Sequence, residues 1–404
     1  MDRKRLTFLV SLFLAICLAL GVAPLAFAGD AGPQFHDPLR NAAKNWSANR
    51  QAEAVAQVTA TMQVVATGLN SPRGLTIGPN GGIYVAEGGV GGADCYQVDP
   101  GDPDFIMCVG ATGSVTRIEN GVQQRIATGL PSLADPSGFA ASGPSRISWR
   151  PRDAFSVILG LGADPALRDQ LAAAFNPMFG DLGKLVRMNP AGSWDYLADV
   201  AAYEGTANPD GGAIDSNPYA VYSAQGRKRL VADAGGNSLV EVDNTGQIKT
   251  LAVFPDRMVP YPPMFGGGMG PMQAVPTSVT EGPDGAIYVG ELTGFPFLPG
   301  EANVYRVLPR QQPQVYAGGF SSIHDITFGP DGSLYVLEIA TDMMACEFFG
   351  ECNGRLIKVA PDGTRTVLAQ DLLFPGGVAV NQAGQVFITL FSIMPEIGMV
   401  VRVQ

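Results

Sequence analysis

One ten-residue pattern occurs three times in this chain, as GPNGGIYVAE at residues 78–87, GPDGAIYVGE at 282–291 and GPDGSLYVLE at 329–338. In each copy, Gly-Pro-Asn/Asp-Gly is typical of a tight turn, because proline presets φ and glycine accepts a positive φ. The Ile/Leu-Tyr-Val that follows is typical of a strand. An apolar stretch also precedes each turn, such as RGLTI before Gly78. The repeated unit is therefore predicted to be strand, tight turn, strand.

Fainter copies of this unit fill the gaps, at residues 144–160, 218–233 and 375–390, with turns expected at 151–153, 224–227 and 381–384. Five of the six units are followed by a second hairpin, such as GSVTRIENGVQQRIA and GRLIKVAPDGTRTVLA. The sixth is cut short, because GMVVRVQ ends the chain after one strand. The missing strand is found near the other end, since MQVVATGL (62–69) matches GVQQRIATGL, the closing strand of the first unit.

Six four-stranded units closed in this way predict an all-β, six-bladed β-propeller over residues 61–404. The N-terminal strand (62–69) would complete the last blade beside the C-terminal strands. The 51 glycines and 31 prolines fit a chain with many turns. A pair of β-sandwiches is the alternative fold, but it does not explain why the two chain ends share one unit.

The N-terminus has the features of a secretory signal peptide. Residues 3–5 are basic, residues 6–20 are almost entirely apolar, and a small-x-small cleavage site ends at Ala28. A lipoprotein signal at Cys17 is the alternative, although Ile16 is bulky for the position before a modified cysteine. We expect cleavage after Ala28, export to the periplasm or the cell exterior, and no stable membrane insertion afterwards. No other stretch approaches the roughly 18–20 apolar residues of a membrane-spanning helix.

Residues 29–60 form a separate leader before the propeller. From residue 38 onward the leader is rich in Ala, Gln and Asn, so we expect either a short helix or a flexible segment. It contains the glycosylation sequon Asn45-Trp46-Ser47, which matters only in a host that glycosylates.

The charge of the chain excludes one class of partner. The formal charge is −11, and it becomes −13 once the signal peptide, with its three basic residues and one acidic residue, is removed. A chain this acidic is not attracted to nucleic acid or anionic lipid. The charge favours cations or cationic ligands, or it simply keeps an exported protein soluble.

Four cysteines remain after signal cleavage, at positions 95, 108, 346 and 352. Four cysteines allow three pairings, and proximity favours Cys95–Cys108 with Cys346–Cys352. An oxidising compartment favours disulfides. Zinc is a poor alternative, because spacings of 13 and 6 are unlike those of structural zinc sites and no histidine is near.

Connection lengths predict which face of the propeller binds. If the strands of a blade are named a to d from the channel outward, the a–b and c–d turns lie on one face and the b–c and d–a connections on the other. The a–b and c–d turns are short here, which makes that side the short-turn face. The long segments all lie on the other side, the long-loop face: 88–112, 131–143, 161–182, 201–217, 255–275, 292–301 and 341–353. Binding residues concentrate in loops held by a rigid scaffold, so we expect the site there.

Two sets of residues reach the long-loop face by the same geometry. The starts of the a strands contribute Arg73, Arg146, Tyr219, Thr277, His324, Asp325 and Gly376. The ends of the b strands contribute Glu87, Asp233, Glu291 and Glu338, with Leu159 and Leu390 in the other two blades. The charged and polar members of both sets except Thr277, together with Asn217 and Asn237, are the ligand-binding candidates.

Four carboxylates at one repeat position predict a ring at the mouth of the channel. Carboxylates held close together need a cation, an arginine or a shared proton. Ca²⁺ or another divalent ion could be bound by these carboxylate oxygens. Arg73 and Arg146 are alternative partners for the carboxylates. The simpler interpretation is that each carboxylate only bonds to the loop after its own strand. No cofactor is certain from the sequence.

A second calcium candidate is the loop NPDGGAIDSNPY (208–219), through Asp210, Asp215 and Asn217. It does not match the spacing of an EF-hand. Clusters of Asn, Asp, Gly and Pro are also typical of plain turns, so this alternative stays open.

Nucleophilic catalysis has little support. The chain contains no G-x-S-x-G elbow, P-loop or Rossmann fingerprint. Of its two histidines, His36 lies in the leader and His324 begins an a strand beside Asp325. His324 is a candidate general base oriented by that carboxylate. The alternative is a hydrogen-bonded residue that lines the channel.

Five longer runs resemble a known family: NSPRGLTIGPNGGIYVAEGG, NPDGGAIDSNPYAV, VADAGGNSLVEVD, VPTSVTEGPDGAIYVGELTGFPF and DGSLYVLEIA. In this order within residues 62–404, they resemble the ScyD/ScyE family, named for proteins encoded with scytonemin biosynthesis genes. The resemblance implies an exported six-bladed propeller and assigns no catalytic residues. The shorter PRGL and GPDG also occur in NHL repeats and sugar dehydrogenases.

Three classes of function stay open. The first is a binding or scaffold module that holds a small molecule, a glycan or a protein on the long-loop face. The second is a divalent-metal-dependent hydrolase similar to the gluconolactonase-like propellers, for which oxygen ligands are offered by Glu87, Asn217, Asp233, Asn237 and Glu291. The third is a quinoprotein sugar dehydrogenase, which the scarcity of histidine and lysine disfavours.

Overall fold

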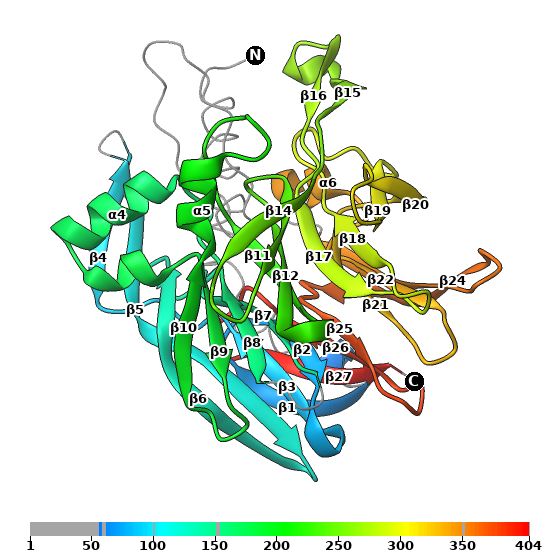
Figure 1. Ribbon diagram of the computed structural model, residues 1–404, viewed down its shortest axis with the longest axis horizontal. Helices are drawn as coiled ribbons and strands as arrows, with labels where there is room; N and C mark the ends of the chain where they lie inside the picture. The colour runs from blue at the N-terminus through cyan, green and yellow to red at the C-terminus, as the bar shows by residue number, and fades with distance from the viewer. Residues whose placement is uncertain (1–55, 59–61, 100–101, 151–153, 350–351, 404) are drawn as a thin grey trace.

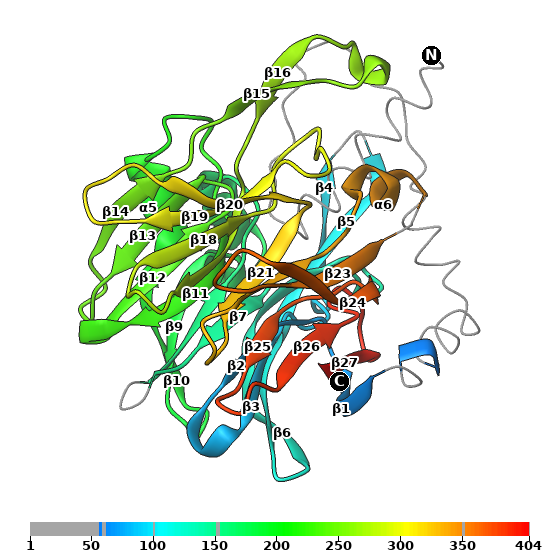
Figure 2. The ribbon, with the colours of Figure 1, turned by 90° about the vertical axis from the view of Figure 1, so that its right-hand side faces the viewer.

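The structure is a computed structural model that describes residues 56–58, 62–99, 102–150, 154–349 and 352–403. Within these residues, six sheets of at least four strands each surround a central axis (Figures 1 and 2). The predicted six-bladed β-propeller is confirmed. The signal peptide, most of the leader and the expected turn at 151–153 lie outside the described residues.

Each blade has the predicted order of strands from the channel outward. The first three blades are β2 (Pro72–Ile77), β3 (Ile83–Glu87), β5 (Asp102–Glu119), β6 (Val122–Ala134); β7 (Pro144–Ser148), β8 (Phe155–Leu159), β9 (Lys184–Met188), β10 (Trp194–Asp199); and β11 (Pro218–Ala224), β12 (Lys228–Asp233), β13 (Ser238–Val242), β14 (Ile248–Val253). The last three are β17 (Pro276–Glu281), β18 (Ile287–Glu291), β19 (Ala302–Val307), β20 (Gln314–Phe320); β21 (Ile323–Phe328), β22 (Leu334–Glu338), β23 (Asn353–Val359), β24 (Arg365–Leu373); and β25 (Val378–Val380), β26 (Val386–Leu390), β27 (Gly398–Val403), β1 (Gln63–Leu69).

The two ends of the described chain close the ring in blade 6. Strand β1 is antiparallel to β27, with Gln63 opposite Arg402 and Leu69 opposite Gly398. The innermost strands contact one another in the order β2, β7, β11, β17, β21, β25 and back to β2. The predicted closure by the N-terminal strand is therefore confirmed.

In the ten-residue pattern, the first glycine and the tyrosine lie in contact. A Cβ on Gly78 would lie 2.4 Å from Cε2 of Tyr84, and one on Gly282 would lie 2.3 Å from Cε2 of Tyr288. The tyrosine ring thus packs over the turn that precedes its own strand. Any larger residue at the glycine position would displace that ring.

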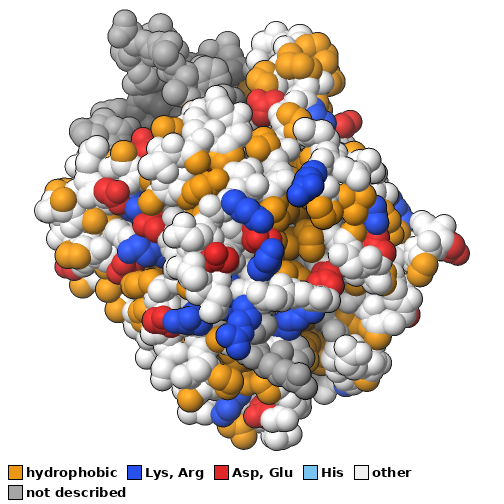
Figure 3. Space-filling model, in the orientation of Figure 1, with side chains coloured by type: hydrophobic (Ala, Val, Ile, Leu, Met, Phe, Trp, Pro, Cys, Tyr) orange, Lys and Arg blue, Asp and Glu red, His pale blue; other side chains and the backbone are white. Residues whose placement is uncertain are grey.

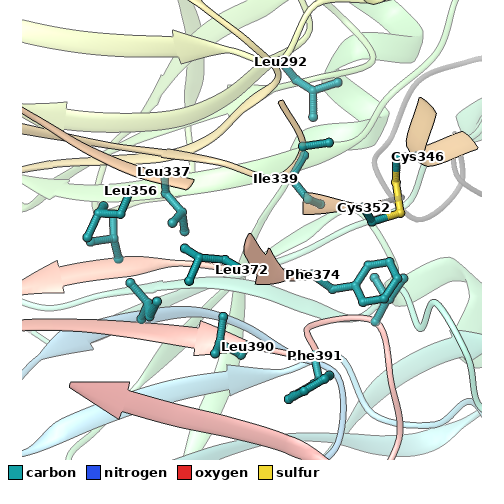
Figure 4. Close-up of a cluster of buried hydrophobic side chains, with 14 of the residues drawn as sticks. Leu292, Leu337, Ile339, Cys346, Cys352, Leu356, Leu372, Phe374, Leu390 and Phe391 are labelled. Carbon is teal, nitrogen blue, oxygen red and sulfur yellow. A yellow bond between two sulfur atoms is a disulfide. The ribbon is translucent and has the colours of Figure 1, made fainter. Parts of the chain in front are cut away.

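The hydrophobic core is divided into layers between neighbouring blades. Alternate side chains of each strand face opposite sides of the sheet, so a blade with neighbours on both sides buries both faces. Between blades 1 and 2, Tyr84, Val157 and Phe155 are buried together. Figure 4 shows the cluster that includes the layer between blades 5 and 6, where Leu337, Leu356 and Leu390 lie together.

The long connections, expected to be loops, contain secondary structure of their own (Figure 1). They contain α4 (Pro165–Ala174), η2 (Pro177–Asp181), α5 (Val200–Ala207), α6 (Met343–Phe349), η4 (Pro263–Phe265) and the strands β4 (Asp94–Asp99), β15 (Arg257–Pro260) and β16 (Met269–Met272). Among the described residues of the short-turn face, the structure adds only the single turns η1 (Pro79–Gly81) and η3 (Gln225–Arg227).

The β15–β16 hairpin projects from the propeller, and hydrophobic side chains gather at its tip in the upper part of Figure 3. Met258, Met264 and Met269 on this hairpin are all more than half exposed.

Both predicted disulfides are present. Cys95 and Cys108 join β4 to β5, and Cys346 and Cys352 join α6 to the residue before β23. Two disulfides point to an oxidising environment. Among the described residues, no helix has the length and apolar character needed to cross a bilayer.

Candidate functional site

The starts of the innermost strands meet in a buried polar layer across the channel. The Arg146 guanidinium donates from Nη1 to the carbonyl of Gly376 (2.7 Å) and from Nη2 to the carbonyl of His324 (2.5 Å). Nη2 also lies 3.4 Å from Oδ1 of Asp325. The Tyr219 hydroxyl is 2.9 Å from Nε2 of His324. Residues from blades 2, 3, 5 and 6 are thus bonded to one another around Arg146. The structure therefore brings together four of the predicted ligand-binding residues, namely Arg146, Tyr219, His324 and Asp325.

A missing side chain makes room for Arg146. A Cβ on Gly74 would lie 2.3 Å from Cδ of Arg146 and 3.1 Å from the carbonyl oxygen of Ser145. The repeat places glycine here in the first blade, directly after Arg73. The arginine of the second blade therefore extends along the first blade towards the opposite side of the channel.

His324 is held in the neutral state by its surroundings. Burial lowers its pKa well below the usual value, and the positive charges of Arg146 and Arg73 lower it further. Its Nδ1 has no hydrogen-bond partner among the described atoms. The Asp325 carboxylate accepts from the backbone N–H groups of Ile326 and Val378. The His324 ring is therefore oriented by Tyr219, and the predicted pairing with Asp325 is not found among its hydrogen bonds.

The other two side chains from the strand starts lie beside this layer. Arg73 donates to the carbonyl of Ala141 (2.8 Å), and Thr277 donates to the carbonyl of Ile323 (2.6 Å). On the long-loop side of the layer, Arg73 and Tyr219 line a pocket of only about 10 Å³. That volume is close to the minimum that holds one water molecule.

A much larger cavity opens on the short-turn face. It has a volume of about 790 Å³ and is lined by the second halves of the innermost strands of all six blades. Arg146 and Asp325 are part of its lining and form its floor. Its walls include Trp149, Tyr222 and Phe328. The lengths of the connections predict a site on the opposite, long-loop face. A sequence shows how long each loop is, but it does not show how wide the channel is at each end.

Three of the four carboxylates at the ends of the b strands pair with arginines rather than with one another. Glu87 accepts from Arg125 (2.8 Å), Glu291 from Arg257 (2.5 Å) and Glu338 from Arg355. Hydroxyl, amide and backbone groups occupy their remaining positions, such as Ser114 and Thr116 on Glu87. Each of these carboxylates is therefore already bonded where it lies. A shared ring at the channel mouth is not formed.

Sequence reasoning missed these three arginines, because they do not share one repeat position. Arg125 lies on β6, Arg257 on β15 and Arg355 on β23. The available signal was the carboxylate itself, since a buried carboxylate requires a charged or hydrogen-bonding partner.

Asp233, the fourth carboxylate of this set, has no arginine partner and belongs to a different group. It accepts from Ser216 Oγ (2.6 Å) and from the backbone N–H groups of Asn217 (2.7 Å) and Gly236 (3.1 Å). Burial raises its pKa to about 6. Glu204 and Asp215 lie nearby, and the Asn237 amide donates to Asp210 (3.1 Å). We name Glu204, Asp210, Asp215 and Asp233 the acid cluster.

The geometry as it stands contains no compact metal centre within the described ranges. No three His, Cys, Asp or Glu side chains of these residues are close enough together to coordinate one ion directly. The predicted metal role of Glu87, Glu291 and Glu338 has no support from their hydrogen bonds, which are satisfied by arginine.

Comparison with known proteins gives no family. No family model matches the chain, and no curated protein matches it either. The resemblance to the ScyD/ScyE family therefore stays a prediction.

Solved structures with a similar arrangement have low identity. One is a streptogramin B lyase, with 14% identity over 84% of this chain and 95% of the other, at a TM-score of 0.43. A second is the PQQ-bound aldose sugar dehydrogenase from Streptomyces coelicolor, with 12% identity over 85% and 96% and a TM-score of 0.48. A third is the calcium-binding protein regucalcin from Agrobacterium tumefaciens, with 11% identity over 85% and 93% and a TM-score of 0.45. At these values, the likenesses carry no argument about function.

Proposed function

We propose that this protein is an exported binding module that holds a small, neutral, hydroxyl-rich molecule, such as a saccharide, in the cavity of the short-turn face. The observation that carries the proposal is the cavity itself, with its volume of about 790 Å³ and its lining from all six blades. Pockets for small ligands typically measure about 300–1,000 Å³.

The lining suits a ligand with both apolar faces and hydroxyl groups. Trp149 and Phe328 are half-buried aromatic residues of the lining, from blades 2 and 5 on opposite sides of the channel. Ser148, Thr280 and Asn381 line the same space with groups that donate and accept hydrogen bonds. Such a combination of apolar walls with a few polar groups fixes the orientation of a ligand.

The charges of the cavity favour a neutral ligand. Arg146 on the floor lies 3.4 Å from Asp325. Glu281, the other acidic residue of the lining, accepts from the Tyr222 hydroxyl and lies 3.8 Å from Arg150. Each charge therefore has an opposite charge beside it, and a charged ligand would have to displace one of these partners.

Export and family membership belong to the same proposal. The two disulfides support an oxidising location, which agrees with the predicted signal peptide. A ScyD/ScyE-like binding role is consistent with both. The geometry favours neither the metal-dependent hydrolase nor the quinoprotein dehydrogenase, since the positively charged Arg146 guanidinium already bonds to the Gly376 and His324 carbonyls in the polar layer.

Tryptophan fluorescence with calorimetry tests this proposal. Monosaccharides and short oligosaccharides are titrated into the mature protein, and we expect at least one to bind and to change the emission of Trp149. Trp149→Ala should weaken that binding at least tenfold. Trp194 is the matched control, because it lies on the outer strand β10 against Tyr196, and Trp194→Ala should bind as the wild type does.

Two results would overturn the proposal. One is the absence of binding for every saccharide tested by a protein with a normal unfolding transition. The other is binding that Trp194→Ala weakens and Trp149→Ala does not, since the ligand would then lie outside the cavity.

A further inference from the structure

The acid cluster lies on the long-loop face, away from the cavity proposed above. Glu204 is on α5, Asp210 and Asp215 are on the connection that follows it, and Asp233 ends β12. Glu204, Asp215 and Asp233 are 1%, 6% and 1% exposed, respectively. Asp210 is half-buried at the edge of the cluster, next to an exposed stretch at 211–214. The acid cluster thus has three buried members and one member, Asp210, at its solvent edge.

Two carboxylate oxygens of this cluster have no partner. Oε1 of Glu204 and Oδ2 of Asp215 are buried and make no hydrogen bond among the described residues. Leaving a buried charged oxygen without a partner costs more than leaving a neutral one. Buried charges in proteins are normally paired or bound to metal. Within the described part of the chain, the cluster therefore lacks at least one positive group.

Both unpartnered side chains face the same short segment of backbone. A Cβ on Gly236 would lie 2.5 Å from Oε2 of Glu204 and 3.4 Å from Cγ of Asp233. A Cβ on Gly235 would lie 3.0 Å from Oδ2 of Asp215. Because glycine has no side chain at these two positions, the Glu204, Asp215 and Asp233 carboxylates approach the same short stretch of backbone closely.

Among the residues that the structure describes, no positive side chain balances these carboxylates. The described hydrogen bonds and ion pairs include no lysine or arginine bound to a member of the cluster. Burial, followed by the neighbouring carboxylates, raises the pKa of Glu204 to about 8 and that of Asp215 to about 7. The Glu87, Glu291 and Glu338 carboxylates each form an ion pair with an arginine. The acid cluster has no such ion pair among the described residues.

We propose that the acid cluster binds a divalent cation, with Ca²⁺ as the preferred ion. No three of these side chains are close enough together to coordinate one ion by themselves, so the proposed ion also takes backbone carbonyl oxygens and water as ligands. Ca²⁺ accepts six to eight oxygen ligands in variable geometry, whereas Mg²⁺ demands a near-ideal octahedron. Asp210, at the solvent edge, is the carboxylate that an arriving ion meets first.

Calcium titration of the full mature protein, after treatment with a chelator, tests the proposal. We expect calorimetry to give one Ca²⁺ per chain and the melting temperature to rise with Ca²⁺ concentration. Glu204→Gln and Asp215→Asn should each bind Ca²⁺ at least tenfold more weakly. Without Ca²⁺ both variants should melt at or above the wild-type temperature, because each removes an unpartnered buried carboxylate.

The controls separate loss of the site from loss of the fold. Asp243→Asn changes an exposed acidic residue in the same blade that accepts from Thr245 and Gln247, and it should bind Ca²⁺ normally. If the buried variants do not fold, Asp210→Asn at the edge takes their place, with the same expected loss. The proposal is wrong if Ca²⁺, Mg²⁺ and Mn²⁺ neither bind nor raise the melting temperature, or if the folded cluster variants retain wild-type affinity.

Discussion

At the scale of single residues, the buried charges of this protein divide by whether an opposite charge lies beside them. Arg146 has Asp325, and Glu87 has Arg125. Glu204 and Asp215 have no such partner among the described residues. A buried pair that loses one member leaves the other without compensation, which is strongly destabilising. The pairing therefore identifies which charged residues hold the channel together and which are available to a ligand.

Replacing Arg146 tests the structural weight of the polar layer. Arg146→Met removes the partner of Asp325 and the donors to the Gly376 and His324 carbonyls. We expect a loss of about 3–5 kcal/mol in the free energy of unfolding, measured with urea. Arg187→Met breaks an exposed pair with Asp195 and should cost less than about 1 kcal/mol. Equal effects of the two variants would contradict a special role for the buried pair.

His324 makes stability depend on pH in a predictable direction. Its pKa is lowered in the folded state, so below about pH 6.5 the unfolded chain binds a proton that the folded chain does not. Stability from this residue is therefore complete above pH 6.5 and is lost as pH falls. Between pH 7.5 and 5.5 the wild type should lose roughly 1.4 kcal/mol more than His324→Gln.

The control for this measurement keeps the histidine and changes its partner. Tyr219→Phe removes the hydroxyl bound to Nε2 of His324 but should retain the wild-type pH dependence. Chemical denaturation at a series of pH values gives the comparison. If wild type and His324→Gln respond to pH in parallel, His324 is not the source of the acid sensitivity.

Part of the site was predictable from sequence because the repeat fixes where each strand starts. Arg146, Tyr219, His324 and Asp325 are each the second or third residue of an innermost strand, so their convergence follows from the propeller alone. The hydrogen bonds between these residues do not follow from the fold, because the pairing of His324 with Tyr219 depends on side-chain rotamers. Glu204 could not be found this way, since it lies on α5, an element that occurs in one blade only.

At the scale of elements, the blades were predictable and the inserted elements were not. A strand that recurs six times is supported by every copy, whereas α4 and α5 each occur once. Local signals for both helices are nevertheless present. Asp164 accepts from Ala166 N with Pro165 in the first turn, and Asp199 accepts from Ala202 N. An acidic N-cap before a short helix is a recognised start signal.

The disulfide between β4 and β5 should stabilise the extension of blade 1. Cys95 and Cys108 are separated by 13 residues, and closing a loop of that size is worth about 3 kcal/mol in the chain-entropy model. The nearby Met107 and Val109 belong to a cluster with Phe179. We expect Cys95→Ser/Cys108→Ser to lower the free energy of unfolding by about 2–4 kcal/mol, as measured by urea denaturation.

The second disulfide is the comparison for this element. Cys346 and Cys352 are only 6 residues apart, so their replacement by serine should cost somewhat less, because loop-closure entropy grows slowly with length. Unchanged stability in the Cys95/Cys108 variant would contradict the assigned role of that bridge.

At the scale of the whole molecule, the propeller is closed by strand pairing between distant parts of the chain. Leu69 on β1 is fully buried and packs with Ala66, Leu75 and Val400 in the layer between blades 6 and 1. If β1 were absent, this layer would be open and β27 would become an exposed edge strand. Exposed edges promote association between chains. The closure was predictable because residues 62–69 repeat the sequence of another closing strand.

A circular permutation tests whether closure or chain order stabilises the ring. Gln63 lies opposite Arg402, so an Asn-Gly turn between Val403 and Met62 should form a hairpin like the one in which Glu119 lies opposite Val122. New ends are opened in the exposed c–d turn of blade 4, between residues 310 and 311. We expect the free energy of unfolding of the permutant to lie within about 1–2 kcal/mol of that of the linear chain 62–403, because the entropy of loop closure changes little.

Deletion of residues 62–69 is the opposite experiment. It removes Leu69 from the buried layer, and truncating one such leucine to alanine already costs about 2–5 kcal/mol. The chain without residues 62–69 should therefore lose more than this amount in its free energy of unfolding, measured with urea. In sedimentation experiments it should form oligomers, whereas the permutant should stay monodisperse like its linear parent. A permutant that fails to fold beside a deleted chain that unfolds normally would show that the ring does not depend on pairing between β1 and β27.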